Sequence, residues 1–547
     1  MILNNLRGHL ARHPKLALTL LTICVSVPFL DKPFNIDDPL FIWTAHQIQA
    51  HPFDPYGFKV VWGWGRGPMW LMSDNPPLTS YYIAAATLIV GWSEVALHLV
   101  FLLPTLAVIL GMLRLARIFS APPAVAALAT LFTPGFLISS TTVMSDMPML
   151  ALWVWAIIFW IDGMEENRLV KLGESAVLVA LAELTKYYGM CLVPLLVAYS
   201  IAARKRVGLE LAFLLIPIAV LCAYQYATRR LYGMNLVSDV ANFSLGKSLA
   251  TVASGDSCLK TLTFIGGCFA TILFFAPLLW KKQAALIWPI ILLTVCAIFW
   301  DSTLLAKYPI PGYLRRSAEI QSALWASAGA SAVALTVLEM LARRDAKTLM
   351  LLLWVCGTFV FTAFCNWTID ARSILPMAPA LGLLIAQRLK RNFEGSPFCR
   401  PAFLACIAAS AAFAIYATEA DCLLAVAIRQ NVRAIYEDYG PNLMGLHFEG
   451  HWGFQYYMSN LGASPLDYRH DKLKAGDLVA IPFNNTNILP PARGKGVLLR
   501  IYSEPGPPLL TTVSPILGAG FYASVIGPLP FVVGPVPRET VAIYSLR

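Results

Sequence analysis

About thirteen apolar runs, separated by short polar segments, constrain this chain more than any other feature. A helix needs about 17 to 25 apolar residues to cross roughly 30 Å of hydrocarbon, and fewer where the bilayer thins. Because 58% of the 547 residues are hydrophobic and only 13% are charged, the sequence predicts an all-α polytopic membrane protein. The runs are residues 16–30, 95–113, 121–141, 147–161, 170–185, 188–203, 207–226, 260–280, 284–300, 318–341, 348–366, 374–388 and 401–418.

Basic residues between the runs predict the orientation, because cytoplasmic loops are enriched in Lys and Arg. If residues 78–91 lie along the outer interface, seven basic clusters share the cytoplasmic side. The N-terminus is then cytoplasmic and the tail after about Thr418 is external. The clusters are Arg7, Arg12 and Lys15; Arg114 and Arg117; Arg168 and Lys171; Arg204 to Arg206; Lys281 and Lys282; Arg343, Arg344 and Lys347; and Arg388, Lys390 and Arg391.

Charge and cysteine spacing also bear on nucleic-acid binding, signal-peptide cleavage and disulfide or metal sites. The formal net charge of +10 is spread over loop clusters, so no nucleic-acid partner is expected. Residues 16–30 after a basic start resemble a signal peptide, but no small-x-small cleavage site precedes Asp31, which favours a retained first span. The cysteines show no disulfide or metal spacing.

Four regions are expected along the chain. Residues 1–30 form the cytoplasmic N-terminus and first span, and residues 31–94 form an external loop with juxtamembrane helices. Residues 95–418 form the transmembrane domain, and residues 419–547 form a small external α/β domain. In this last region 478–482, 496–502 and 541–544 are typical of strands, and 423–439 is typical of a helix.

Two adjacent acids, Asp37 and Asp38, follow the first apolar run. A carboxylate near hydrocarbon is costly unless it faces water, a cation or a reacting group. Asp38 has a structural explanation, because Pro39 suits the first turn of a helix to about Ala50 and Asp38 suits its N-cap. Asp37 has no such explanation, so it is the first candidate for a functional residue.

Other unusual charges all fall at predicted outward ends of spans. Each has a structural alternative. Asp146 can be an N-cap, Lys186 can extend from a helix end toward water, and the arginine pairs can bind lipid headgroups. Arg372 can form a surface ion pair with Asp370. His46 is expected to be a packed or solvated helix residue, since it has no metal-type partner three or four residues away. The charges are Asp146, Glu183, Lys186, Arg229, Arg230, Asp301, Lys307, Arg315, Arg316 and Arg372.

Together these groups have a chemical logic. A carboxylate can take a proton from an attacking hydroxyl, which is the work of a general base. Fixed guanidinium and ammonium groups can stabilise the charge that builds on a departing phosphate. A sugar linked to a lipid phosphate presents such a group at the bilayer surface, and no Gly-rich nucleotide loop is present.

The order of these motifs resembles the polytopic glycosyltransferases of the C-type fold, especially the bacterial family of lipid A aminoarabinose transferase, related to protein O-mannosyltransferases. The similar motifs are Asp37-Asp38, Asn75-Pro76-Pro77-Leu78, Asp146, Leu184-Thr185-Lys186, and Arg372 with Ile374-Leu375-Pro376. The resemblance implies that Asp37 acts as base or orients the acceptor, with Asp38 as the second acid of the pair. It places Lys186, next to Tyr187, and Arg372 in the pocket for the donor phosphate.

Two departures from the family pattern matter. The family often follows its acid pair with Arg-Tyr, where this chain has Leu40-Phe41, and often has Lys where this chain has Asn75. We therefore expect Arg66 or Arg315 and Arg316 to complete the phosphate site. The resemblance leaves open whether a divalent metal bridges Asp37 and the phosphate.

The sequence favours an inverting transferase with Asp37, Asp38 and Asp146 as catalytic candidates. Donor binding is assigned to Arg66, Lys186, Tyr187, Arg229, Lys307, Arg315, Arg316 and Arg372. The expected partners are a polyprenyl-phosphate sugar, membrane lipid and an external lipid, glycan or protein acceptor. The alternatives are a lipid or solute transporter, which would place charged sites near the midplane, and a non-catalytic glycan-assembly protein. The aromatic segment 447–457 is expected to help bind the acceptor or cover the cavity, or to form the aromatic core of the C-terminal domain.

Overall fold

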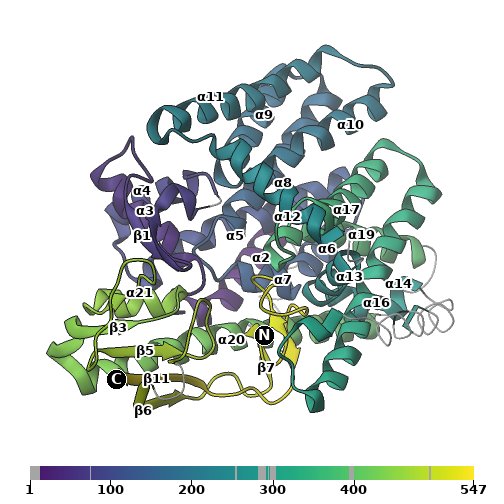
Figure 1. Ribbon diagram of the computed structural model, residues 1–547. Helices are drawn as coiled ribbons and strands as arrows, with labels where there is room; N and C mark the ends of the chain where they lie inside the picture. The colour runs from purple at the N-terminus through teal and green to yellow at the C-terminus, as the bar shows by residue number, and fades with distance from the viewer. Residues whose placement is uncertain are drawn as a thin grey trace, which may run out of the picture.

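The computed structural model describes residues 13–547, apart from residue 74 and segments 253–255, 281–290, 293–294, 296–303, 394–399 and 492–494. Most of the predicted span 284–300, with Asp301, Arg7 and Arg12, lies outside the described residues. The described part is mostly helical, with a small region of strands near the C-terminus (Figure 1).

Within the described residues, seven helices are long and apolar enough to cross a membrane. The bent pair α13 (Asp256–Cys268) and α14 (Thr271–Trp280), which meet at 87°, would make an eighth span. The chain is therefore an integral membrane protein, while the count of thirteen spans stays a prediction. The seven are α5 (Glu94–Ile118), α8 (Asp146–Glu166), η3 (Tyr187–Cys191) with α10 (Leu192–Arg204), η4 (Leu209–Leu214) with α11 (Leu215–Tyr232), α16 (Gly312–Arg343), α17 (Ala346–Phe364) and α20 (Arg400–Tyr439).

Several other predicted spans are short or broken. The run 121–141 forms α6 (Pro123–Leu131) and α7 (Pro134–Ser139), because Thr133 before Pro134 is extended, as a residue before proline tends to be. The run 374–388 begins with α18 (Ala371–Ile374) and continues as α19 (Met377–Asn392). The first and fifth runs form α2 (Pro14–Ser26) with η1 (Val27–Phe29), and α9 (Leu169–Thr185).

The segment between α2 and α5 is folded against the helices. It contains α3 (Asp38–Ala50), which confirms the helix predicted to end at about Ala50, and α4 (Leu78–Val90). Between these two helices, β1 (Lys59–Trp62) and β2 (Gly65–Pro68) form an antiparallel hairpin, followed by η2 (Met69–Leu71). Farther along the chain, α12 (Leu236–Val252) follows α11.

The C-terminal residues carry a five-stranded sheet in the order β4-β3-β5-β11-β6. Strand β11 (Glu539–Leu546) pairs antiparallel with β5 (Leu478–Pro482) and β6 (Gly496–Glu504), and these three confirm the predicted strands. The sheet also contains β3 (Leu446–Phe448) and β4 (Ser464–Pro465), and the segment includes η7 (Gly440–Gly445) and α21 (Trp452–Asn460). Short pairs join β7 (Leu510–Thr511) to β10 (Val532–Val533), and β8 (Val513–Ser514) to β9 (Ala519–Gly520).

The C-terminal sheet and the helices share one hydrophobic core. Buried residues of α3, α8 and α19, such as Ile42, Trp160 and Leu384, belong to the same cluster as Phe448 and Ile543 of the sheet. Helix α20 runs unbroken across the predicted boundary at residues 418 and 419. In Figure 1 the sheet lies next to α21, which contacts α3, so the C-terminal part is placed to contribute to a site formed by the first loop.

Candidate active site

One cavity of about 590 Å³ collects polar side chains from segments far apart in the chain. Its walls come from the start of α3, the hairpin and η2, the end of α9, α12, the loop before α19, and the C-terminal part. The charged residues that line it are Asp37, Lys186, Asp239, Asp370 and Arg372, and its aromatic residues include Tyr187, Trp367, Trp452 and Tyr522. The structure thus brings together four predicted site residues: Asp37, Lys186, Tyr187 and Arg372.

Asp37 and Arg372 form an ion pair at the wall of this cavity. The guanidinium Nη1 of Arg372, in α18, donates to Asp37 Oδ2 at 2.7 Å and lies 3.3 Å from the sulfur of Met144. Burial lowers the pKa of Arg372, but Asp37, Asp146 and Asp370 together raise it above its ordinary value. The guanidinium therefore stays charged. Its Nε is buried and has no hydrogen-bond partner among the described residues, which leaves a donor for an anion.

Lys186 is held by Asp146 beside the same cavity. The chain leaves α9 with an extended backbone at Lys186, and Lys186 Nζ donates to Asp146 Oδ1 at 2.6 Å. The Lys186 side chain is therefore fixed by an ion pair rather than reaching freely toward water. Asp146 is 1% exposed and begins α8 without capping it, since Ser145 is the N-cap. Asp146 is thus suited to position the ammonium group, and the N-cap interpretation was wrong.

Asp38 faces away from the cavity and binds backbone amides. Asp38 Oδ2 accepts from the Asn35 amide at 2.9 Å, and Oδ1 accepts from the Val143 amide at 2.8 Å. The N-cap of α3 is Asp37, so Asp38 joins the first loop to the start of α8 rather than capping its own helix. Burial raises the pKa of Asp38 to about 7, although the Asn35 amide, Lys32 and the Val143 amide lower it.

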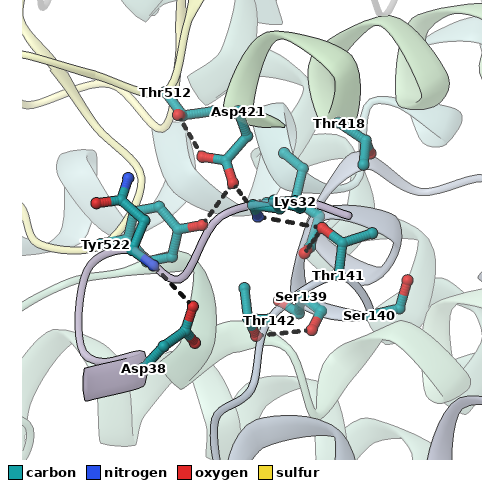
Figure 2. A network of polar contacts seen from close by, with 12 residues as sticks. Lys32, Asp38, Ser139, Ser140, Thr141, Thr142, Thr418, Asp421, Thr512 and Tyr522 are labelled. Atoms are coloured by element: carbon teal, nitrogen blue, oxygen red, sulfur yellow. Dashed lines mark hydrogen bonds and ion pairs between the residues drawn. The ribbon is translucent and has the colours of Figure 1, made fainter. Parts of the chain in front are cut away.

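A buried network that the sequence did not indicate lies behind Asp38. Lys32 Nζ is 2.6 Å from Asp421 Oδ2, with both side chains at most 2% exposed, and it donates to Thr141 at 3.2 Å. Asp421 also accepts from the hydroxyls of Thr512 and Tyr522 (Figure 2). The signal in the sequence was two acids, Glu419 and Asp421, within the apolar stretch of α20.

This network reaches the cavity through Tyr522. The Tyr522 ring lines the cavity and lies 6.0 Å from the Arg372 guanidinium carbon, within the range of a cation–π contact. Removing one partner of a buried ion pair destabilises a protein by about 3–5 kcal/mol. The Lys32–Asp421 pair therefore fixes the C-terminal segment against the first loop and the cavity wall.

The structure places the other predicted cations elsewhere. Arg66, on β2, lines a separate cavity with Trp43 and Phe58. Lys307 Nζ lies 2.7 Å from Asp256 Oδ2. Arg229, in the last turn of α11, and Arg316, in the first turns of α16, are exposed, and Arg315 also lies in α16. The expectation that all these charges share one pocket was wrong for these five, because a position at a helix end fixes depth in the membrane but not lateral position.

Strained backbone marks two residues of the cavity wall. Ile36 and Trp452 have φ values of +50° and +64°, and both line the cavity. Left-handed backbone in a non-glycine residue costs about 1–3 kcal/mol and persists where the surroundings enforce it. Gly453 packs so closely that an added Cβ would lie 2.3 Å from the Phe34 carbonyl oxygen. The contact between α21 and the segment before Asp37 thus sets the geometry of the site.

Asp370 also has a structural role at the cavity. Its Oδ1 accepts from the Ser373 amide at 2.6 Å as the cap of α18, the turn that carries Arg372. Burial raises the pKa of Asp370, while Arg372 and Lys186 lower it. The expected surface ion pair between Asp370 and Arg372 is replaced by the pair of Arg372 with Asp37.

The described residues do not offer a cluster of metal ligands. No group of three or more His, Cys, Asp or Glu side chains within the described ranges is arranged to hold a metal ion. Asp37, the residue considered as a metal ligand, is engaged by Arg372. The two cations of this cavity, Lys186 and Arg372, can instead bind an anion.

One segment of the chain matches a protein-family model by sequence. A family model described as dolichyl-phosphate-mannose-protein mannosyltransferase matches residues 74–226. The resemblance to polytopic glycosyltransferases of the C-type fold is thereby confirmed. The matched segment contains Lys186, Tyr187 and Asp146, while Asp37 and Arg372 lie outside it. No curated protein sequence matches the chain.

Solved structures of glycosyltransferases are also similar to this chain. ArnT from Cupriavidus metallidurans, bound to undecaprenyl phosphate, is 14% identical with a TM-score of 0.48, covering 96% of this chain and 97% of that one. The apo oligosaccharyltransferase of Archaeoglobus fulgidus is 12% identical with a TM-score of 0.49, covering 82% of this chain. The chain spans only 64% of the length of that archaeal protein.

Proposed function

We propose that this protein is an inverting glycosyltransferase that moves a sugar from a polyprenyl-phosphate-linked donor to an acceptor at the outer face of the membrane. The observation that carries the proposal is the meeting of Asp37, Lys186 and Arg372, from three separate segments, on one cavity. The description of the matching family, which names a dolichyl-phosphate sugar, supports a lipid-phosphate donor.

Asp37 is the general base in this proposal. The acceptor hydroxyl oxygen attacks the anomeric carbon of the donor sugar, and its proton passes to the Asp37 carboxylate. The bond between the anomeric carbon and the phosphate oxygen breaks, and polyprenyl phosphate leaves with the electron pair. A single displacement of this kind inverts the anomeric configuration. Because Arg372 holds Asp37 at 2.7 Å, the carboxylate is oriented before the acceptor arrives.

Arg372 and Lys186 stabilise the leaving phosphate. Preorganised cations lower the barrier where negative charge develops in the transition state, and an arginine can contact two phosphate oxygens at once. The unpartnered Nε of Arg372 is one such donor. Asp146 holds the Lys186 ammonium group in place, so the phosphate would meet two fixed positive charges.

The aromatic lining of the cavity suits the rest of the substrates. Trp70, Trp367 and Trp452 line it together with Phe243 and Val240 of α12. Aromatic rings present apolar faces on which a sugar ring or a lipid chain can pack. Only Trp452 of the aromatic segment 447–457 lines this cavity, and neighbours such as Phe454 are buried in the core. The identities of the sugar and of the acceptor are set by groups beyond the acid and the two cations.

The transporter alternative predicts charged sites near the middle of broken helices. Here Asp146 begins α8, Lys186 follows the end of α9, and Arg372 lies in a one-turn helix before α19. These positions at helix ends favour a site at a membrane surface and therefore the transferase. We place this surface on the periplasmic side of a bacterial inner membrane.

The test is sugar transfer by the purified full-length protein and by Asp37→Asn. Donors are polyprenyl-phosphate mannose and polyprenyl-phosphate aminoarabinose, each with a radiolabelled sugar, and the acceptor is a membrane extract. Loss of a general base should slow transfer by about 10²- to 10⁴-fold. Asp31→Asn is the matched control, because Asp31 is an exposed acid of the same loop and does not line the cavity, so it should transfer at the wild-type rate. Undiminished transfer by Asp37→Asn would remove Asp37 from the mechanism.

A further inference from the structure

A second cavity, of about 400 Å³, lies at the opposite end of the helices that form the candidate active site. Met164 at the end of α8, Arg204 at the end of α10 and Lys347 at the start of α17 line it. Phe361, near the other end of α17, lines the cavity of the candidate active site, which is called the Asp37 cavity below. A helix of 19 residues is about 28 Å long at 1.5 Å per residue, which is close to the hydrocarbon thickness. The two cavities therefore lie at opposite membrane interfaces.

This second cavity carries both signs of charge. Arg204, Arg343 and Lys347 line it together with Glu165 and Asp345. Lys347 Nζ is 2.7 Å from Glu165 Oε1 and donates to the Ile118 carbonyl at 3.0 Å. The cations outnumber the acids by one among these lining residues, so the cavity favours a group that contains an anion without excluding an attached cation.

Two arginines of this cavity offer donors to a phosphate. Arg204 donates to the Met164 carbonyl and to Asn167 Oδ1, both from Nη2, and its Nε and Nη1 have no hydrogen-bond partner among the described residues. Arg343 Nε is 3.7 Å from Glu339 Oε2, a distance that leaves its hydrogen bonds unsatisfied. Planar guanidinium groups match the oxygens of a phosphate.

Gln387 supplies the observation that selects the ligand. Its side chain is 2% exposed and lines this cavity. Gln387 Nε2 donates to the Phe119 carbonyl at 2.6 Å, which fixes the orientation of the amide. The other atom, Oε1, is buried with no hydrogen-bond partner in the part of the chain that the structure describes. Because buried acceptors are normally paired, a ligand that carries an N–H or O–H donor would complete the site.

The surroundings of the cavity suit a lipid rather than a soluble metabolite. Ile201 and Val207, which flank Arg204 in the chain, are exposed apolar side chains, as is Leu341, two residues before Arg343. On a membrane protein such side chains face acyl chains. A headgroup in the cavity could therefore remain joined to chains that lie along this apolar surface.

We propose that this cavity binds the headgroup of phosphatidylethanolamine at the interface opposite the Asp37 cavity. The phosphate pairs with Arg204 and Arg343, and the ammonium group donates to Gln387 Oε1 near the carboxylates of Glu165 and Asp345. Phosphatidylcholine has the same phosphate but no N–H donor. Phosphatidylglycerol has hydroxyl donors but no positive charge to match the two acids.

The test is native mass spectrometry of the full-length protein with added phosphatidylethanolamine, phosphatidylcholine or phosphatidylglycerol of identical acyl chains. One charge-assisted hydrogen bond predicts that phosphatidylethanolamine is retained about tenfold better than phosphatidylcholine. Equal retention of these two lipids, or best retention of phosphatidylglycerol, would overturn the proposal. This comparison uses the wild-type protein, so it does not depend on the folding of any variant.

Two variants and one control locate the binding. Gln387→Leu should abolish the preference for phosphatidylethanolamine over phosphatidylcholine, because it removes the acceptor and leaves the arginines. Arg204→Ala should weaken retention of both lipids. Arg206→Ala is the control, since Arg206 is an exposed neighbour that does not line the cavity. A preference that survives in Gln387→Leu would place the lipid elsewhere and contradict the assignment.

Discussion

At the scale of single residues, the acid doublet divides into two roles that the sequence could not assign in full. Asp37 faces the cavity and the charged Arg372, whereas Asp38 accepts two backbone amides in the interior. The sequence indicated that one acid was structural, because Pro39 follows Asp38. It could not indicate the partners, because the Val143 amide is more than a hundred residues away in the chain.

The pKa of Asp38 predicts a dependence of stability on pH. Burial raises it from 3.8 to about 7 in the folded state, so the folded protein keeps the proton over a range in which the unfolded chain has lost it. Between about pH 4 and pH 7 the folded state binds more protons, and the contribution of Asp38 to the free energy of unfolding must fall as pH rises. The thermal midpoint of wild type minus that of Asp38→Asn should therefore be largest near pH 4 and shrink toward pH 7.5.

The comparison with Asp38→Asn isolates this group, because Glu539 and Asp370, whose pKa values are also raised, are present in both proteins. The measurement is thermal unfolding in one detergent, followed by circular dichroism across that pH range. A difference between the two midpoints that stays constant, or that grows as pH rises, would show that Asp38 does not carry the raised pKa.

At the scale of elements, the sequence predicted what depends on local patterns. Helix α3 and strands β5, β6 and β11 follow from periodicity and turn residues that lie close together in the chain. The break at Thr133 before Pro134 could have been read in the same way. The cavity could not be predicted from local patterns, because the Lys32–Asp421 pair and the contact of Gly453 with Phe34 join residues hundreds of positions apart.

The contact between α21 and the first loop predicts a variant that loses activity while staying folded. In Gly453→Ala the new Cβ would meet the Phe34 carbonyl oxygen at 2.3 Å, so the backbone that leads to Asp37 must move. A misplacement of about 1 Å at a catalytic group can slow a reaction by about 10²-fold. Sugar transfer should fall by that order, with a smaller change in thermal midpoint than core substitutions cause.

The same segment offers a matched control. Gly445 would place an added Cβ within 4 Å of no other atom, so Gly445→Ala should transfer sugar at the wild-type rate. Wild-type transfer by Gly453→Ala would show that α21 does not set the position of Asp37. Equal losses in both variants would attribute the effect to the C-terminal part in general.

At the scale of the whole molecule, the two cavities define two faces. Helix α8 runs from Asp146, which holds Lys186 at the first cavity, to the segment with Met164 and Glu165 at the second. Its 21 residues correspond to about 32 Å, enough to cross the hydrocarbon. The positive-inside preference then predicts that the second cavity, with Arg204, Arg343 and Lys347, faces the cytoplasm and that the Asp37 cavity faces outward.

This orientation predicts opposite labelling of two exposed positions. Phe53, 90% exposed in the loop after α3, and Leu209, 91% exposed after α10, belong to the two faces. In a variant whose native cysteines are replaced, Phe53→Cys should react with a membrane-impermeant maleimide on intact spheroplasts. Leu209→Cys should react only after the membrane is opened. Reaction of both cysteines before the membrane is opened would indicate leaky membranes. A cytoplasmic marker protein that stays unlabelled in the same sample excludes such leakage. Reaction of Leu209→Cys alone would show that the protein has the opposite orientation. The Asp37 cavity would then face the cytoplasm, where an external acceptor could not reach it.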